Sequence, residues 1–277
     1  MKKATKKWLL AAGVAVLLGM IIFGGAMAMA KWDFTKLSAG GYETNIHHIT
    51  EAFNGISVTT KISDITFAPS DDGMCTVVCY DREKVTHAVE VQDGTLVIRV
   101  VDSRKWYEHI GIHFGTSKIT VYLPQEEYGA LTVKSGTGDV EIPDGFLFES
   151  IAVTAATGNI GNGASASGLI KIKTNTGDIR LQSVAADALQ LSVSTGGIAV
   201  SDITCLGDVK VDVSTGKAKL TNVTCKKLLS GGSTGDITLK NVIAAEKFSI
   251  KRSTGDVKLE RCDATELYME TDTGDVS

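Results

Sequence analysis

Proline and aromatic residues are scarce in the second half of this sequence. Of 277 residues only three are proline, the last being Pro143, and after Phe148 the only aromatic residues are Phe248 and Tyr268. Because proline cannot donate a backbone hydrogen bond, its absence is compatible with an unbroken β-ladder. The lack of aromatic rings favours a thin aliphatic core and disfavours a sugar-binding surface built from aromatic platforms.

Acidic residues are absent from the first 30 positions, which contain four lysines and then an uncharged run of 23 residues from Trp8 to Ala30. As a helix this run would be about 35 Å long, enough to cross a hydrocarbon core of about 30 Å. We therefore expect a basic cytoplasmic segment at 1–7 and a transmembrane anchor or uncleaved signal at 8–30. The alternative is a signal peptide cleaved after Ala28 or Ala30, which exports the same remainder.

Basic residues are not concentrated beyond this N-terminal segment. The whole chain carries a net charge of −4 and the first 30 residues carry +4, so the remainder carries −8. Binding to nucleic acid requires a basic patch, and none is evident, so we expect no nucleic-acid partner. The expected location is the cell membrane, with a single pass and an extracytoplasmic C-terminal domain.

What the sequence does contain is a repeated Thr-Gly pair. Eight copies follow one another at intervals of 19 or 20 residues. In six of them the next residue is Asp or Asn, and an aliphatic residue comes after it in every copy. The glycines of the repeat are Gly138, Gly158, Gly177, Gly196, Gly216, Gly235, Gly255 and Gly274. A constant period of this length indicates a repeat architecture.

Apolar and polar residues alternate between the Thr-Gly pairs. In TGDITLKNV, Ile237 and Leu239 fall on one face and the residues between them on the other. This alternation predicts about two short strands per repeat, and stacked repeats can share a continuous core. We therefore predict an all-β fold: a parallel β-solenoid (β-helix) of 19–20-residue coils with a β-rich N-terminal cap, preceded by one transmembrane helix.

The glycine of each pair is expected to form a corner of the coil with a positive φ, which would cost a residue with a Cβ about 1–2 kcal/mol. The Asp or Asn after it can hydrogen-bond the turn backbone. The alternative is a row of carboxylates that binds Ca²⁺, with Asp236, Asp256 and Asp275 as candidate ligands. Because Lys217 lies in the same row, we favour turn chemistry and expect no metal, cofactor or catalytic residue.

The five cysteines have neither CxxC nor zinc-site spacing. Cys75 and Cys79 lie on the same face of a predicted strand, too far apart to form a disulfide bond. Cys205 and Cys225 occupy equivalent positions in neighbouring coils, where other repeats have alanine. The simplest interpretation is that they are small apolar fillers, and a disulfide bond between them is the alternative. Cys262 aligns with a valine of the preceding coil and is predicted to be part of the core.

The chain before the regular coils is less periodic. We interpret residues 31–54 as a tether, residues 55–130 as a β-rich cap with the first irregular coils, and residues 131–277 as the regular solenoid. The DGT sequence at 93–95 predicts a hairpin turn.

Four histidines of this region are candidate metal ligands. His109 and His113 flank IGI in KWYEHIGIHFG, and His47 and His48 lie in the predicted tether. No carboxylate is placed to complete a ligand set, so we expect the first pair to lie in a polar loop.

Several stretches carry a resemblance to a known family: KWDFTKL, ISDITFAPSDD, DGTLVI, KWYEHIGIHFG, ITVYLP and the STGD repeats. In these, and in its lysine-flanked anchor, nearly the whole chain resembles the bacterial putative-adhesin family of extracytoplasmic β-solenoids, most of them of unknown function. The resemblance implies surface attachment and no catalytic residue. Because members continue through further TGD coils, we expect the chain to continue beyond Ser277. The alternative is that another molecule covers the edge of the last coil.

Three functions follow from these patterns. The first is a membrane-anchored, extracytoplasmic, non-enzymatic interaction protein, an adhesin or cell-surface module, held by residues 8–30 and binding a surface or envelope protein or a glycan. The alternative is a cell-envelope stress or signalling accessory, which would bind a membrane partner of the same cell through its cap or tether.

The second alternative is a polysaccharide-binding or polysaccharide-cleaving β-helix. Cleavage requires clustered Asp with Arg or Lys on one face. Arg180, Arg252 and Arg261 are the only arginines of the coils and fall at unrelated coil positions. We therefore expect that the protein is not an enzyme.

Overall fold

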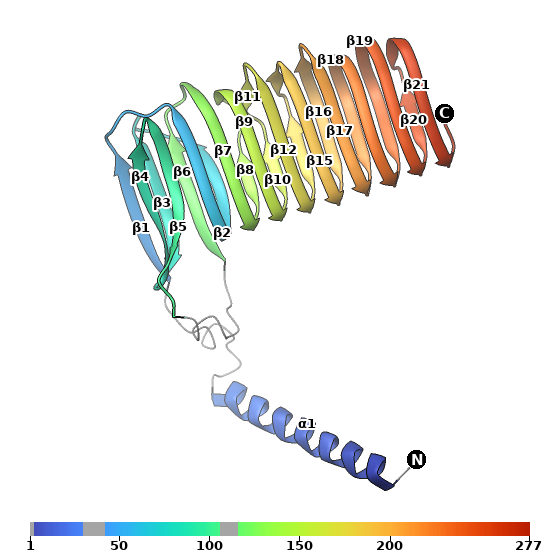
Figure 1. Ribbon diagram of the computed structural model, residues 1–277. Helices are drawn as coiled ribbons and strands as arrows, with labels where there is room; N and C mark the ends of the chain where they lie inside the picture. Colours follow the sequence, from blue (N-terminus) through green and yellow to red (C-terminus); the bar gives the residue numbers. More distant parts are fainter. Residues whose placement is uncertain (1–2, 30–41, 106–115) are drawn as a thin grey trace. The chain divides into compact units, whose positions relative to one another are not determined.

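The structure, a computed structural model, describes residues 3–29, 42–105 and 116–277. Helix α1 (Lys3–Met29) belongs to one compact unit, and the β-structure of residues 42–102 and 116–277 forms the other (Figure 1). Each is described by itself.

Helix α1 is apolar over most of its length. Its segment Ala12–Met29 has a mean hydropathy of 2.2. This length and composition fit a membrane span, and they equally fit a signal sequence.

The second unit consists of β-strands. The strands that precede the Thr-Gly repeats are β1 (Tyr42–Ile49), β2 (Gly55–Pro69), β3 (Cys75–Arg82), β4 (Val85–Gln92), β5 (Thr95–Asp102) and β6 (Ser117–Leu123). The strands that follow are β7 (Glu127–Thr137), β8 (Val140–Ile142), β9 (Leu147–Thr157), β10 (Ile160–Asn162), β11 (Ser165–Ala166), β12 (Leu169–Thr176), β13 (Ile179–Gln182), β14 (Ala185–Ala186), β15 (Ala188–Thr195), β16 (Ile198–Cys205), β17 (Asp208–Thr215), β18 (Ala218–Thr234), β19 (Ile237–Thr254), β20 (Val257–Glu260) and β21 (Asp263–Thr273).

The repeats form a parallel β-solenoid, as predicted. Strands after the Thr-Gly corner (β8, β10, β13 and β16) pair in parallel from coil to coil. Strands before the next corner (β7, β9, β12, β15 and β17) do the same on the other face. Strands β18 and β19 run through both faces (Figure 1). Equivalent residues of successive repeats therefore lie side by side.

The core is a stack of inward-facing aliphatic side chains. It extends as one cluster from Ile56 to Val257. Paired residues such as Ile160, Ile179 and Ile198 form its rows and are almost fully buried. Since each coil contributes the same few positions, the alternation in the sequence is sufficient to build this core.

Strand β2 begins the coil stack, although it lies far from the repeats in sequence. It pairs in parallel with β7 and β8, and the chain then departs to form β3–β6 before it returns. In this departing segment β5 and β6 pair in parallel with β2, while β4 pairs antiparallel with β5 and β3 antiparallel with β6. Between β4 and β5, Asp93 and Gly94 have φ values of 50° and 71°, which makes the predicted DGT turn a two-residue hairpin turn.

The prediction of a tether over 31–54 is wrong for its second half. Residues Tyr42–Ile49 form strand β1, which pairs antiparallel with β3 over its whole length. The antiparallel partner lies more than 25 residues away in sequence, so the local pattern, in which His47 and His48 interrupt the alternation, did not indicate a strand. The other half of the tether, up to residue 41, lies outside the described residues.

Candidate functional site

The eight repeat glycines lie at corners of the coils, with φ values between 124° and 144°. At Gly235, a Cβ would lie 1.9 Å from the Gly216 carbonyl oxygen of the preceding coil. The corner therefore combines a left-handed backbone with a close backbone approach, and both favour glycine.

The Asp or Asn after each glycine bonds to the next coil. The Asp139 side chain accepts from the Asn159 backbone N–H at 2.7 Å, and the Asn159 side chain accepts from Asp178 at 2.9 Å. The same bond joins Asp64 of β2 to the Asp139 N–H at 3.0 Å, although 75 residues separate them. These side chains form a corner ladder that begins at β2.

The corner ladder is interrupted at Gly197 and Lys217, which have no side-chain acceptor. There the Lys217 ammonium forms an ion pair with Asp236 at 3.0 Å. This bond, together with the backbone N–H of Asp256, lowers the pKa of Asp236. Asp256 in turn accepts from the Asp275 N–H at 2.9 Å. The three carboxylates considered for Ca²⁺ are thus arranged along the ladder, beside a lysine.

Four cysteines are buried, and Cys262 is partly exposed against the core. All five are free thiols, so Cys205 and Cys225 are not bridged. Burial raises the pKa of Cys75 and of Cys225 to about 12. His109 and His113 lie outside the described residues.

A charged side chain is buried among the coils. Arg252 of β19 donates to the Gly231 carbonyl at 2.9 Å and to the Ser230 hydroxyl at 3.0 Å. Its guanidinium occupies the space next to Gly232, where a Cβ would lie 1.5 Å from the Nη1 atom. Burial lowers the pKa of Arg252. Because its partners are backbone and hydroxyl groups of the neighbouring coil, its role is to join coils.

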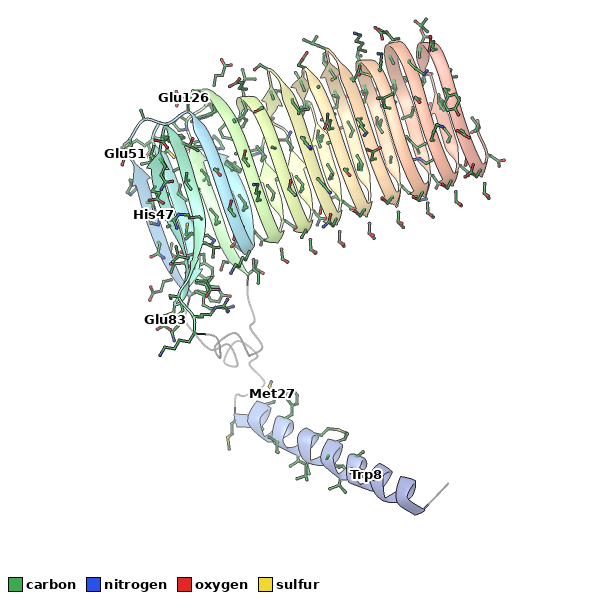
Figure 2. All side chains as sticks on the ribbon, viewed as in Figure 1. Trp8, Met27, His47, Glu51, Glu83 and Glu126 are labelled. Carbon is green, nitrogen blue, oxygen red and sulfur yellow. The ribbon has the colours of Figure 1, made fainter. Side chains whose placement is uncertain are left out.

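An open groove of about 790 Å³ runs across the outer face of β8, β10, β13, β16 and β18. Its floor includes Gly161 and Ala199, whose small size produces the hollow. Its polar lining residues include Glu141, Arg180, Gln182, Ser201, Lys219 and Thr221. The outward side chains of successive coils can be followed along the solenoid in Figure 2. The groove can accept a polar, extended ligand that crosses several coils.

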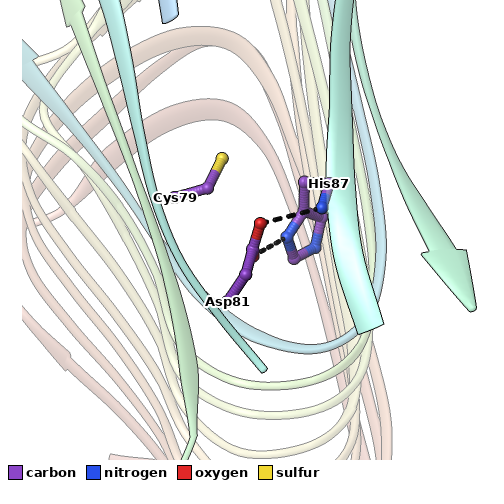
Figure 3. Close-up of side chains that lie close together, drawn as sticks. All are labelled: Cys79, Asp81 and His87. Carbon is purple, nitrogen blue, oxygen red and sulfur yellow. Dashed lines mark hydrogen bonds and ion pairs between the residues drawn. The ribbon is translucent and has the colours of Figure 1, made fainter. Parts of the chain in front are cut away.

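A buried set of titratable side chains lies between β3 and β4 (Figure 3). His87 Nδ1 lies 2.6 Å from Asp81 Oδ1, and the His87 backbone N–H donates to Asp81 Oδ2 at 3.0 Å. Both side chains are at most 1% exposed. Cys79 is two residues before Asp81 on β3 and faces the same way. These three residues are called the cap cluster below.

Hydrogen bonds extend the cap cluster to β1 and β2. Asn45 of β1 donates to Asp81 Oδ2 at 3.3 Å. On the other side, His87 Nε2 lies 3.2 Å from Thr60 Oγ1 and 3.4 Å from Ser63 Oγ. Burial tends to raise the pKa of Asp81, but the hydrogen bonds from His87 and Asn45 outweigh it and hold the pKa below its usual value of 3.8.

An Asp–His–hydroxyl line is also the arrangement of a serine hydrolase. Here Ser63 is 1% exposed and donates its hydrogen to the Ile62 carbonyl at 2.7 Å. A nucleophile must reach a substrate and give its proton to the histidine. The cap cluster meets neither condition and does not provide a hydrolytic site.

The local sequence pattern around His87 does not reveal this cluster, because its partners lie on another strand. One signal was available: in CTVVCYDR the alternation that places Cys75 and Cys79 inward also places Asp81 inward. A buried carboxylate requires a partner. Among the described residues, Cys79, Asp81 and His87 are the one group of His, Cys, Asp or Glu side chains whose ligand atoms converge, all within 4.8 Å of one another.

A family model described as Toastrack DUF4097 matches residues 53–211 and 204–277. No curated protein shows significant similarity to the sequence.

Three solved structures share the fold. A putative adhesin from Bacteroides fragilis NCTC 9343 has a TM-score of 0.50 and 19% identity, covering 86% of this chain and 97% of that chain. A putative lipid binding protein from Parabacteroides distasonis ATCC 8503 has a TM-score of 0.56 and 16% identity, covering 86% and 98%. A putative adhesin from the same organism has a TM-score of 0.52 and 15% identity, covering 87% and 98%.

Proposed function

Because the chain belongs to the Toastrack DUF4097 family, we propose that it is a membrane-anchored, extracytoplasmic interaction protein of the adhesin type, which acts by contact and not by catalysis. Helix α1 would hold it in the membrane. The coils would present a binding surface outside the cell. Two of the three similar structures are described as adhesins, which supports this proposal.

The observation that carries the proposal is the groove over Gly161 and Ala199. At these two positions small side chains leave room for a ligand. Along the strand register, Glu141 lies at one end of the groove, Arg180 in the middle and Lys219 at the other end. Parallel strands lie about 4.8 Å apart, so a ligand with regularly spaced polar groups can bond to several coils.

The chemistry of this lining favours a polar surface molecule, either a glycan or an extended protein segment. One similar structure is described as a lipid binding protein. An acyl chain requires an enclosed apolar cavity, whereas this groove is open and its outward residues include Glu141, Arg180 and Lys219 as well as Gly161 and Ala199. We therefore do not extend lipid binding to this groove.

The test uses a soluble protein of residues 31–277 and two tryptophan variants. Ala199→Trp fills the groove, and Gln190→Trp places the same side chain at an exposed position of β15 on the opposite face. We expect wild type and Gln190→Trp to be retained on cell surfaces or matrix proteins, and Ala199→Trp to lose at least about ten-fold in affinity. Circular dichroism checks that both variants fold.

Retention is compared between the producing cell's own envelope and foreign surfaces. Preference for foreign surfaces that depends on Ala199 supports the adhesin. Preference for its own envelope that is unaffected by Ala199→Trp contradicts binding by the groove and favours a signalling accessory that acts through the cap. Equal loss of binding in both tryptophan variants also contradicts the proposal that the groove is the binding site.

A further inference from the structure

The cap cluster combines three kinds of metal-ligating atom. The Cys79 sulfur and the Asp81 carboxylate come from alternate positions of β3, and the His87 ring comes from β4, opposite them (Figure 3). Thiolate, carboxylate and imidazole are the ligand types found around Zn²⁺. The proposed adhesin function uses none of these residues.

Hydroxyl groups line the far side of the His87 ring. Thr60 donates to Ser63 Oγ at 2.8 Å, and Ser63 donates to the Ile62 carbonyl at 2.7 Å. His87 Nε2 lies 3.2 Å from Thr60 Oγ1, so a hydrogen on Nε2 has an acceptor when Nδ1 binds an ion.

On the near side of the ring, His87 Nδ1 and Asp81 Oδ1 lie 2.6 Å apart, which is the distance of a direct hydrogen bond. A Zn²⁺ ion bound by both atoms would replace this hydrogen bond, at metal–ligand distances of about 2.0–2.2 Å. The Cys79 sulfur lies within 4.8 Å of a ligand atom of each residue and supplies a third ligand type.

Binding of Zn²⁺ by these three residues keeps the buried charge balanced. The Asp81 carboxylate and a Cys79 thiolate balance the two positive charges of the ion, and the His87 ring serves as a neutral ligand. An apolar core tolerates such an ion because no net charge becomes buried.

We propose that Cys79, Asp81 and His87 form a Zn²⁺ site, in which the Asn45 amide donates to Asp81 and orients its carboxylate. The outer hydrogen bonds are in place. The His87 Nε2–H group is held by Thr60, and Asp81 accepts from the His87 backbone. Such bonds orient zinc ligands in proteins.

The site joins strands that are distant in sequence. Its ligands lie on β3 and β4, and its supporting hydroxyl groups lie on β2, the first strand of the coil stack. Bound Zn²⁺ therefore fastens the cap to the solenoid. Burial, reinforced by the Asp81 charge, raises the pKa of the Cys79 thiol to about 12.

The test uses the full chain in detergent, because the site is closed in the folded protein and must be loaded during folding. The chain is unfolded in urea with chelator and refolded with Zn²⁺ or Co²⁺. Cys79→Ala is compared with Cys75→Ala, a matched control on the same face of the same strand. Metal content after gel filtration gives the stoichiometry, and the Co²⁺ spectrum reports thiolate coordination.

We expect one ion per chain and a thiolate-to-cobalt band in wild type and in Cys75→Ala. Cys79→Ala should lose the band and bind at least ten-fold more weakly, while circular dichroism shows that it folds. His87→Gln provides a second variant with the same expected loss. The proposal is overturned if wild type retains no ion or lacks the cobalt band, or if Cys79→Ala binds as tightly as Cys75→Ala.

Discussion

At the scale of single residues, the corner glycines have the most specific role. Their positive φ alone makes a side chain unfavourable, and the carbonyl of the preceding coil occupies the space where a Cβ would lie. Relief of this contact would require separating two hydrogen-bonded coils. The corner therefore cannot adapt to a larger residue without loss of strand pairing.

Gly235→Ala is accordingly expected to lower the free energy of unfolding by at least about 2 kcal/mol. The matched control is Gly197→Ala, at a corner position without positive φ, where the nearest atom to a Cβ is 3.4 Å away. It should change stability by less than about 0.5 kcal/mol. Urea unfolding of the soluble protein, followed by circular dichroism, measures both. Equal unfolding midpoints for the two variants would contradict the role of the corner.

Single residues of the cap were harder to predict than those of the coils. The inward position of Asp81 follows from alternation, but its partner His87 lies on the next strand. Their contact depends on how the β3–β4 hairpin folds over β2, which no short-range pattern specifies. The corner residues, in contrast, are marked eight times by the same dipeptide.

At the scale of elements, the coils were predictable because neighbouring strands are also neighbours in the repeat. The cap was not. Strand β1 pairs with β3, and β2 pairs with β7 across 75 residues, so both depend on contacts between distant segments. The predicted tether over 31–54 was wrong at β1 for this reason.

The assignment of inward faces to β3, β16 and β18 can be tested through their thiols. Cys75, Cys205 and Cys225 face inward, and Cys262 follows β20 at a partly exposed position. Burial raises the pKa of the Cys75 and Cys225 thiols from 9.0 to about 12, which lowers the thiolate fraction at pH 8 by about a thousand-fold.

Alkylation of the native protein at pH 8 should therefore modify Cys262 and leave the inward thiols unmodified, as measured by mass spectrometry. The thiolate forms of Cys75 and Cys225 are disfavoured in the folded state. Their contribution to stability is thus complete below pH 9 and declines as the pH rises toward 12. Unfolding in guanidinium should expose all five cysteines. Rapid labelling of Cys225 in the native protein would show that this side chain faces outward, which would contradict the assignment of the inward face of β18.

At the scale of the whole molecule, the protein has an apolar N-terminal helix and a solenoid whose outer face contains an open groove. The interior is used for aliphatic stacking, so a ligand can be recognised only by outward side chains. Outward side chains of successive coils, among them Glu141, Arg180 and Lys219, line one open groove of about 790 Å³. We therefore expect this groove to bind a molecule on a cell surface.

Photo-crosslinking of the full chain in living cells tests that claim most directly. A photoreactive residue replaces Gln182, which lies in the groove on β13, or Gln190, an exposed glutamine on β15 of the opposite face. If the groove binds a surface molecule, a crosslinked adduct forms from position 182 and none forms from position 190. Adducts from neither position, or equally from both, would contradict binding by the groove.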